Sequence, residues 1–169
     1  MHPFILLIWV DAVARLDSSV RIAYHPVIHK ASRIGDFNFS SDFNKTKIQT
    51  YIQRITIYNS KLVSISRMHV YDQVPVSEDE RIKVALVCPA LTAPAAEEGA
   101  VGNLKEIAQV VKVQNGVNAQ WHSGGGEGDP ALGKDGKIKW TCELAPQEKV
   151  TLSLEYTVSA PAGVTLAGI

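Results

Sequence analysis

Apolar and polar side chains alternate along several stretches of this chain, and this alternation limits the possible folds more than any other feature. In the run that includes Ile55 and Ile57, every second side chain is apolar. The pattern is clearest between residues 149 and 159, where one face of an extended chain carries Val150, Leu152, Leu154, Tyr156 and Val158. A period of two residues is typical of half-buried β-strands, because successive strand side chains point to opposite faces.

The alternating runs and the turn residues between them predict a single all-β domain. Strands are expected at residues 20–24, 47–58, 62–74, 81–88, 105–113, 116–121, 137–144 and 149–159. Seven or eight short strands without a long helical period are typical of an antiparallel, immunoglobulin-like β-sandwich. We therefore predict one sandwich domain over residues 20–169, preceded by an apolar segment over residues 1–19.

Turn residues predict how some of these strands connect. Asn59-Ser60-Lys61 favours a tight hairpin because Asn tolerates the left-handed backbone, so stretch 62–74 is expected to pair with stretch 47–58. Within stretch 62–74 the apolar positions change parity near Ser66 and Arg67, which predicts a β-bulge. Asp135-Gly136 predicts a hairpin turn that introduces strand 137–144.

Composition excludes some classes of partner. The chain has 169 residues, a length typical of one domain, with 46% hydrophobic residues. Its 17 basic residues balance 17 acidic ones, and no dense Lys/Arg run occurs. Nucleic acids and anionic membranes attract clustered positive charge, so neither is an expected partner.

The N-terminal stretch 3–10 is apolar and allows two interpretations. With Ala12-Val13-Ala14 it resembles a signal segment and its cleavage site. However, no Lys or Arg precedes it and Asp11 follows it directly, so we favour a buried strand or the start of a truncated chain. The stretch is far shorter than the ~20 residues that cross a bilayer, so no membrane span is predicted.

The two cysteines are expected to be free thiols. Cys142 follows the apolar alternation of strand 137–144, which predicts a small core residue. Cys88 ends a strand before Pro89, and a bridge to Cys142 would require the two strands to be close neighbours. Free thiols are usual in a reducing compartment, so a cytoplasmic location is slightly favoured.

Metal and catalytic sites find little support in the motifs. In the acidic segment 72–80, Ser77 and Glu80 form a capping-box pattern that predicts one turn of α-helix or 3₁₀-helix, and the carboxylates of this segment lack calcium-loop spacing. His25, His29 and His69 would make a zinc site only if the fold gathered them. No Gly-x-Ser-x-Gly elbow or phosphate loop occurs. We therefore predict no catalytic residue, no metal site and no cofactor.

Trp121 is the best candidate for a ligand contact, together with His122. Both precede the glycine-rich stretch 123–130, which is typical of a mobile loop. An exposed indole there would offer a face on which a sugar ring can stack. Trp140, in contrast, shares the alternation of Ile138 and Leu144 and is expected to point into the core.

Three groups of motifs give the chain from residue 20 onward a family resemblance. They are Gln53-Arg54-Ile55-Thr56-Ile57-Tyr58-Asn59-Ser60-Lys61, Asp72-Gln73-Val74-Pro75-Val76-Ser77-Glu78-Asp79-Glu80-Arg81-Ile82-Lys83-Val84, and Gly136-Lys137-Ile138-Lys139-Trp140 with Leu144-Ala145-Pro146. Together they resemble the C-terminal β domain of mucoidy inhibitor A-like proteins, in the style of the fungal branch. The resemblance implies a β-sandwich module of unknown function with no catalytic motif. Family members usually carry an N-terminal domain and a coiled coil before this region, so a fragment or an altered gene model is expected.

These observations predict a non-catalytic structural or protein-interaction module. Its partners would be other domains of a longer family member or a separate protein, bound at exposed sheet edges near residues 20–30 and 62–70. A chain that lacks part of a larger sheet would form homo-oligomers at those edges. The alternative is a carbohydrate-binding module that uses Trp121 and the adjacent loops.

Overall fold

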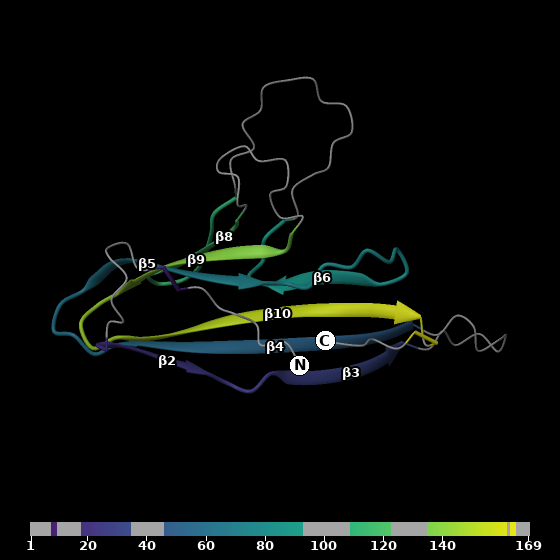
Figure 1. The fold of residues 1–169 in the computed structure, drawn as a ribbon, viewed down its shortest axis with the longest axis horizontal. Coiled ribbons are helices and arrows are strands. Elements are labelled where there is room, and N and C mark those ends of the chain that lie inside the picture. Colours follow the sequence, from purple (N-terminus) through teal and green to yellow (C-terminus); the bar gives the residue numbers. More distant parts are fainter. Residues whose placement is uncertain are drawn as a thin grey trace, which may run out of the picture.

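The computed structural model describes residues 8–9, 18–34, 46–92, 109–122, 135–161 and 163–164. Within these ranges the chain is all-β (Figure 1). No helix occurs there, and so none that is long and apolar enough to cross a membrane. The strands are β1 (Ile8–Trp9), β2 (Val20–Tyr24), β3 (Ile28–Ile34), β4 (Thr46–Asn59), β5 (Ile65–Gln73), β6 (Lys83–Cys88), β7 (Val111–Gln114), β8 (Val117–Trp121), β9 (Lys137–Leu144) and β10 (Lys149–Pro161).

The strands form two antiparallel sheets that pack face to face as a β-sandwich. The first sheet has the order β1-β5-β9-β8-β7, and the second has the order β2-β4-β10-β6, with β3 also paired to β4. The described residues thus contain ten strands, more than the seven or eight expected. The excess arises because β2 and β3 pair with successive parts of β4, and because a two-residue β1 pairs with β5.

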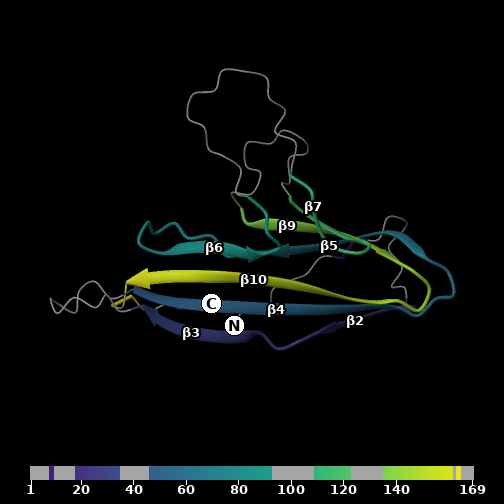
Figure 2. The ribbon, with the colours of Figure 1, turned by 180° about the vertical axis from the view of Figure 1, so that it is seen from behind.

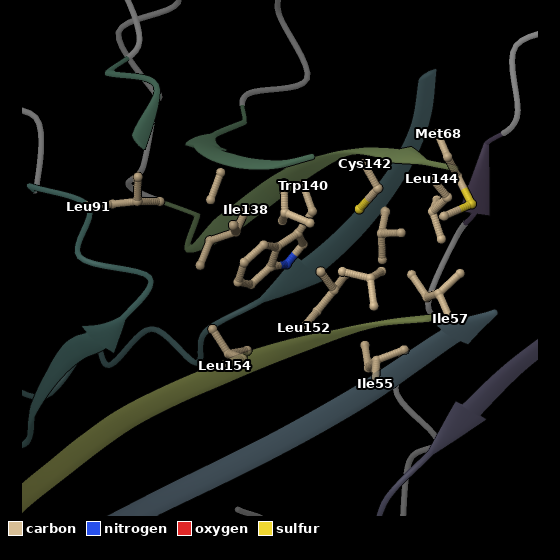
Figure 3. Close-up of a cluster of buried hydrophobic side chains, with 14 of the residues drawn as sticks. Ile55, Ile57, Met68, Leu91, Ile138, Trp140, Cys142, Leu144, Leu152 and Leu154 are labelled. Atoms are coloured by element: carbon tan, nitrogen blue, oxygen red, sulfur yellow. The ribbon is translucent and has the colours of Figure 1, made fainter. Parts of the chain in front are cut away.

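The core lies between the sheets and is built from the alternating apolar positions. Figure 3 shows the Trp140 indole lying between β9 and β10, close to Leu152 and Leu154. Trp140 is fully buried, as its alternation predicts, and Cys142 beside it is also fully buried. Both cysteines are free thiols, as expected. Burial of these side chains removes apolar surface from water, which is the main force that holds the two sheets together.

The predicted hairpin between stretches 47–58 and 62–74 is wrong. β4 pairs with β2, β3 and β10, whereas β5 lies in the other sheet and pairs with β9 and β1. The connection crosses between the sheets around Asn59, whose side chain is fully buried. Asn59 Nδ2 donates to the carbonyl oxygens of Val63 and Ala145, each at 2.9 Å, and Asn59 Oδ1 accepts from Lys61 N at 3.0 Å. These three bonds favour a crossover because they tie the link to the β9–β10 turn.

Other local predictions are confirmed. The register of β5 against β9 shifts between Ile65 and Met68, where a β-bulge was predicted. Gly136 has a φ of +70° and directly precedes β9. The expected docking edge at 62–70 is not a simple edge, because residues 62–64 form the crossover and β1 pairs with β5 at His69 and Val70.

β4 and β10 extend beyond the ends of β5 and β9, as Figures 1 and 2 show from opposite sides. This extension divides their ladder into two parts. The near half comprises residues 53–59 of β4 and 149–154 of β10, which pair with each other and lie against the first sheet. The far half comprises residues 46–52 and 155–161, flanked by β3 on one side and β6 on the other.

Candidate functional site

Trp121 is buried rather than displayed. Only 7% of its surface is exposed, and its indole Nε1 donates to the Thr92 carbonyl oxygen at 2.8 Å. In the ladders of the first sheet it stands in a cross-strand row with Ile138 and Asp72, all three facing the second sheet. A buried ring with a satisfied N–H offers little face for a sugar to stack on.

His122 lies on the opposite face of the first sheet. Its ring contacts Tyr71 with centroids 4.7 Å apart, and its backbone N donates to the Lys137 carbonyl oxygen at 2.9 Å. Burial lowers the pKa of His122, and the positive charges of Lys139 and Lys137 lower it further, while Asp135 raises it. Trp121 and His122 therefore do not face one common site. The glycine-rich stretch 123–130 beside them lies outside the described residues.

The three candidate zinc ligands are not gathered. His25 Nε2 lies 2.8 Å from Thr56 Oγ1, and the His29 ring stacks on Tyr51 with centroids 4.8 Å apart. His69 belongs to the other sheet, where its Nδ1 lies 3.3 Å from Thr141 Oγ1. In the part of the chain that the structure describes, no group of three or more His, Cys, Asp or Glu side chains could hold a metal ion.

The acidic segment forms a tight turn and not the predicted helical turn. Asp79 N donates to Ser77 Oγ at 3.2 Å, and Ile82 N donates to the Asp79 carbonyl oxygen at 2.9 Å. Arg81 stabilises this turn in place of the expected Glu80. Its Nη2 and backbone N donate to the Asp79 carboxylate at 2.7 and 2.9 Å. The Arg81 side chain lowers the pKa of Asp79 to about 2.

A cavity of about 480 Å³ lies between this segment and β6. Its walls are formed by residues 74–77, by Ile82 and residues 84–86, and by Leu91, Trp121 and Gly136. None of these side chains is charged. Sequence reasoning missed this cavity, and the only local sign was the apolar pair Val74 and Val76 around Pro75, which resembled an ordinary strand end.

An aromatic row lies across the far half of the second sheet. His29, Tyr51 and Tyr156 are cross-strand neighbours on β3, β4 and β10, and the Tyr51 and Tyr156 rings stack with centroids 5.2 Å apart. Tyr51 is buried, and its hydroxyl donates to Gln49 Oε1 at 2.9 Å. Direct cross-strand aromatic pairs stabilise a sheet locally, so this row keeps the far half ordered.

Asp72 marks the boundary between the two halves. Burial raises the pKa of the Asp72 carboxyl to about 6, because the charged form loses its hydration, while the Gln73 backbone N, which donates to Oδ1, opposes the shift. Burial also raises the pKa of Tyr156 to about 12, with Tyr51 and Asp72 adding to the shift. Both side chains are half-buried at the place where the two halves meet.

The sheet edge formed by β2 and β3 carries three exposed apolar side chains. Tyr24, Val27 and Ile28 have 53%, 52% and 40% of their surface exposed. Among the residues described, no strand pairs with the outer side of β2 or β3. This edge lies around Pro26, which separates the two strands.

These features define an all-β sandwich domain with open sheet edges and an apolar cavity beside β6. A model of the family described as a domain of unknown function, DUF4139, matches residues 16–162. Because the match covers most of the chain, the protein belongs to the DUF4139 family. No curated protein and no solved structure matches the chain.

Proposed function

We propose that this chain is a non-catalytic protein-interaction module that docks through its β2–β3 edge. Its motifs resemble the C-terminal β domain of mucoidy inhibitor A-like proteins, so the partner would be another domain of such a protein or a separate protein chain. An immunoglobulin-like arrangement of the sandwich belongs to the same proposal. The family match supports a shared domain and leaves the role open.

The proposal rests on one observation, namely that exposed apolar side chains lie on a sheet edge that has no partner strand in the described ranges. Natural sheets usually protect such edges with lysine, short strands or a covering segment. Here Tyr24, Val27 and Ile28 are exposed on consecutive parts of an edge that has no partner strand in the described ranges. A strand added from another chain would satisfy the edge backbone and cover these side chains.

The thiol chemistry supports binding over catalysis. Burial raises the pKa of Cys142 to about 12, and burial and Glu155 raise the pKa of Cys88. Both thiols are therefore protonated at neutral pH, whereas a nucleophilic cysteine needs a lowered pKa. Free thiols also suit the reducing compartment, the cytoplasm, that we propose.

The carbohydrate alternative is less well supported. It requires Trp121 to present a ring face to solvent, and the ring is 7% exposed and bonded to Thr92. We therefore favour a protein partner.

Self-association of the full chain tests the proposal, because a free edge without its partner pairs with a second copy. Light scattering coupled to size-exclusion chromatography, from about 5 to about 500 µM, should show a mass that rises with concentration for the unsubstituted chain. The double substitution Val27→Lys and Ile28→Lys should weaken association at least roughly tenfold, because lysine blocks edge pairing.

Val110→Lys is the matched control, since Val110 is 58% exposed and precedes β7 in the other sheet. It should leave the association unchanged. A chain that stays monomeric over the whole range, or one that associates equally well with both lysines present, would refute docking at this edge.

A further inference from the structure

The second sheet has another open edge, on the side opposite β2 and β3. β6 is the last strand in the order β2-β4-β10-β6, and within the described ranges β10 is its single partner. Its inward side chains Val84 and Leu86 are half-buried, although Val158, the cross-strand neighbour of Val84, is fully buried. The chain between β5 and β6 runs back along β6 on the side away from β10 (Figures 1 and 2).

The cavity occupies the space between β6 and this returning chain. Residues 74–77 form one wall and residues 84–86 the other, with Trp121 and Leu91 at the base. We call this space the β6 slot. It therefore combines an unpaired strand edge with an apolar hollow beside it.

The walls of the β6 slot are held in place from both ends. Val74 N donates to the Gly136 carbonyl oxygen at 2.9 Å, and a Cβ on Gly136 would lie 2.2 Å from the Val74 carbonyl oxygen. At the other end, the Asp79–Arg81 pair closes the turn with a contact of 2.7 Å. A preformed site loses less conformational entropy on binding.

The residues that line the β6 slot favour an extended peptide over a small molecule as its ligand. Sites for small molecules usually combine an apolar pocket with a few convergent polar side chains that orient the ligand. Here Ser77 is the single polar side chain in the lining, and its Oγ already accepts from Asp79 N. The remaining polar groups are those of the backbone, which is the recognition surface that an extended peptide uses.

The turn 78–81 joins the two walls, and we call it the rim of the slot; it carries two exposed glutamates and is followed by the exposed Lys83 at the start of β6. Glu78 and Glu80 are exposed, and neither takes part in a salt bridge within the described residues. Arg81, the nearest cation in the turn, is engaged by Asp79. A ligand that places Lys or Arg beside this rim would gain favourable electrostatic interaction and a faster association rate.

We propose that the β6 slot binds an extended peptide segment of a partner protein, which adds as a strand to β6. One large aliphatic or aromatic side chain of the peptide enters the cavity above Trp121. A lysine or arginine next to that side chain lies near Glu78 and Glu80. This site is independent of docking at the β2–β3 edge, because β4 and β10 separate the two edges.

A phage-displayed library of random peptides of about twelve residues, panned on the full chain, tests this proposal. Enriched peptides should share a bulky apolar residue with an adjacent Lys or Arg. One synthetic consensus peptide should then shift the backbone amide resonances of residues 83–88 and slow their hydrogen exchange, because strand addition creates new backbone hydrogen bonds.

Val76→Glu is the decisive variant, since Val76 lines the slot and is 58% exposed, so the fold tolerates the change. It should weaken binding of the consensus peptide at least about tenfold, or roughly 1.4 kcal/mol. Val110→Glu, at an equally exposed position outside the slot, should change the affinity by less than about twofold. Glu78→Lys combined with Glu80→Lys should weaken binding of the basic consensus peptide several-fold.

Five results would overturn the proposal, and four of them concern ligands. They are the absence of any enriched peptide, equal binding of the consensus peptide to Val76→Glu, resonance shifts confined to β2 and β3, and an apolar dye such as 1-anilinonaphthalene-8-sulfonate filling the slot while no peptide does. A self-association that Val76→Glu abolishes would assign the slot to a second copy of this chain and would also overturn it.

Discussion

The near and far halves of the β4–β10 ladder share one uninterrupted register but differ in chemistry. In the near half, the inward positions carry Ile55, Leu152 and Leu154, which belong to the buried core. In the far half, the same alternation presents Tyr51 and Tyr156 inward, followed by the buried Val158 and Ala160 outside that core cluster. The backbone pairing is therefore the same throughout, and the side chains decide which half holds the fold together.

Under the two docking proposals, core packing and recognition would occupy largely separate parts of the second sheet. The near half is covered by the first sheet, so its apolar side chains contribute to folding. The far half extends past that sheet, and both flanking strands, β3 and β6, have an open edge in the residues that the structure describes. Substitutions in the two halves should accordingly affect different measurements.

The largest expected effect comes from a matched pair of leucines. Leu152 in the near half is 2% exposed, so Leu152→Ala should lower the free energy of unfolding by about 2–5 kcal/mol through lost burial and a cavity. Leu86 beside the far half is only half-buried, and Leu86→Ala should cost about 1 kcal/mol. Urea denaturation of both variants measures the difference. Equal losses would break the distinction between the halves.

Gly136 tests how firmly the turn before β9 holds one wall of the β6 slot. Gly136→Ala should lower the free energy of unfolding by about 1–3 kcal/mol, because φ is +70° and the new Cβ would meet the Val74 carbonyl oxygen. Gly163→Ala is the control, since nothing lies within 4 Å of a Cβ there. If thermal melting shows no difference between these variants, the wall of the slot is less rigid than we argue.

The pH dependence of stability tests the burial of Asp72 at the boundary between the two halves. The Asp72 carboxyl has a pKa of about 6 in the folded protein against 3.8 for the unperturbed group, so the folded state holds the proton more tightly. Stability should therefore fall as pH rises from about 4 to about 6 and stay lower above that range. Asp72→Asn should raise the free energy of unfolding near pH 7.5 by on the order of 1–3 kcal/mol and change it little near pH 4.

The exposed Glu143 supplies the control for this charge effect. Glu143→Gln should change stability by less than about 0.5 kcal/mol at either pH. A gain from Asp72→Asn that is the same at both pH values would show that desolvation of the charge is not its cause.

Local predictions succeeded where neighbouring residues determine the conformation. The bulge in β5 follows from a change of parity within one strand, and the turn before β9 follows from Asp135-Gly136. The prediction for Asn59 failed because its buried side chain bonds to Ala145, far along the chain. Trp121 and His122 face opposite sides of their sheet because they are adjacent near a strand end, and a ligand contact by either residue stays a prediction.

The sequence by itself determined most of the strands, the inward positions of Trp140 and Cys142, and the all-β class, because alternation and turn chemistry act over a few residues. Only the tertiary structure decided which strands share a sheet, because pairing partners are chosen by contacts between distant segments. It also decided that residues 74–77 and β6 enclose a cavity. The physical reason is that an apolar side chain follows the same pattern whether it fills a core or lines an empty space.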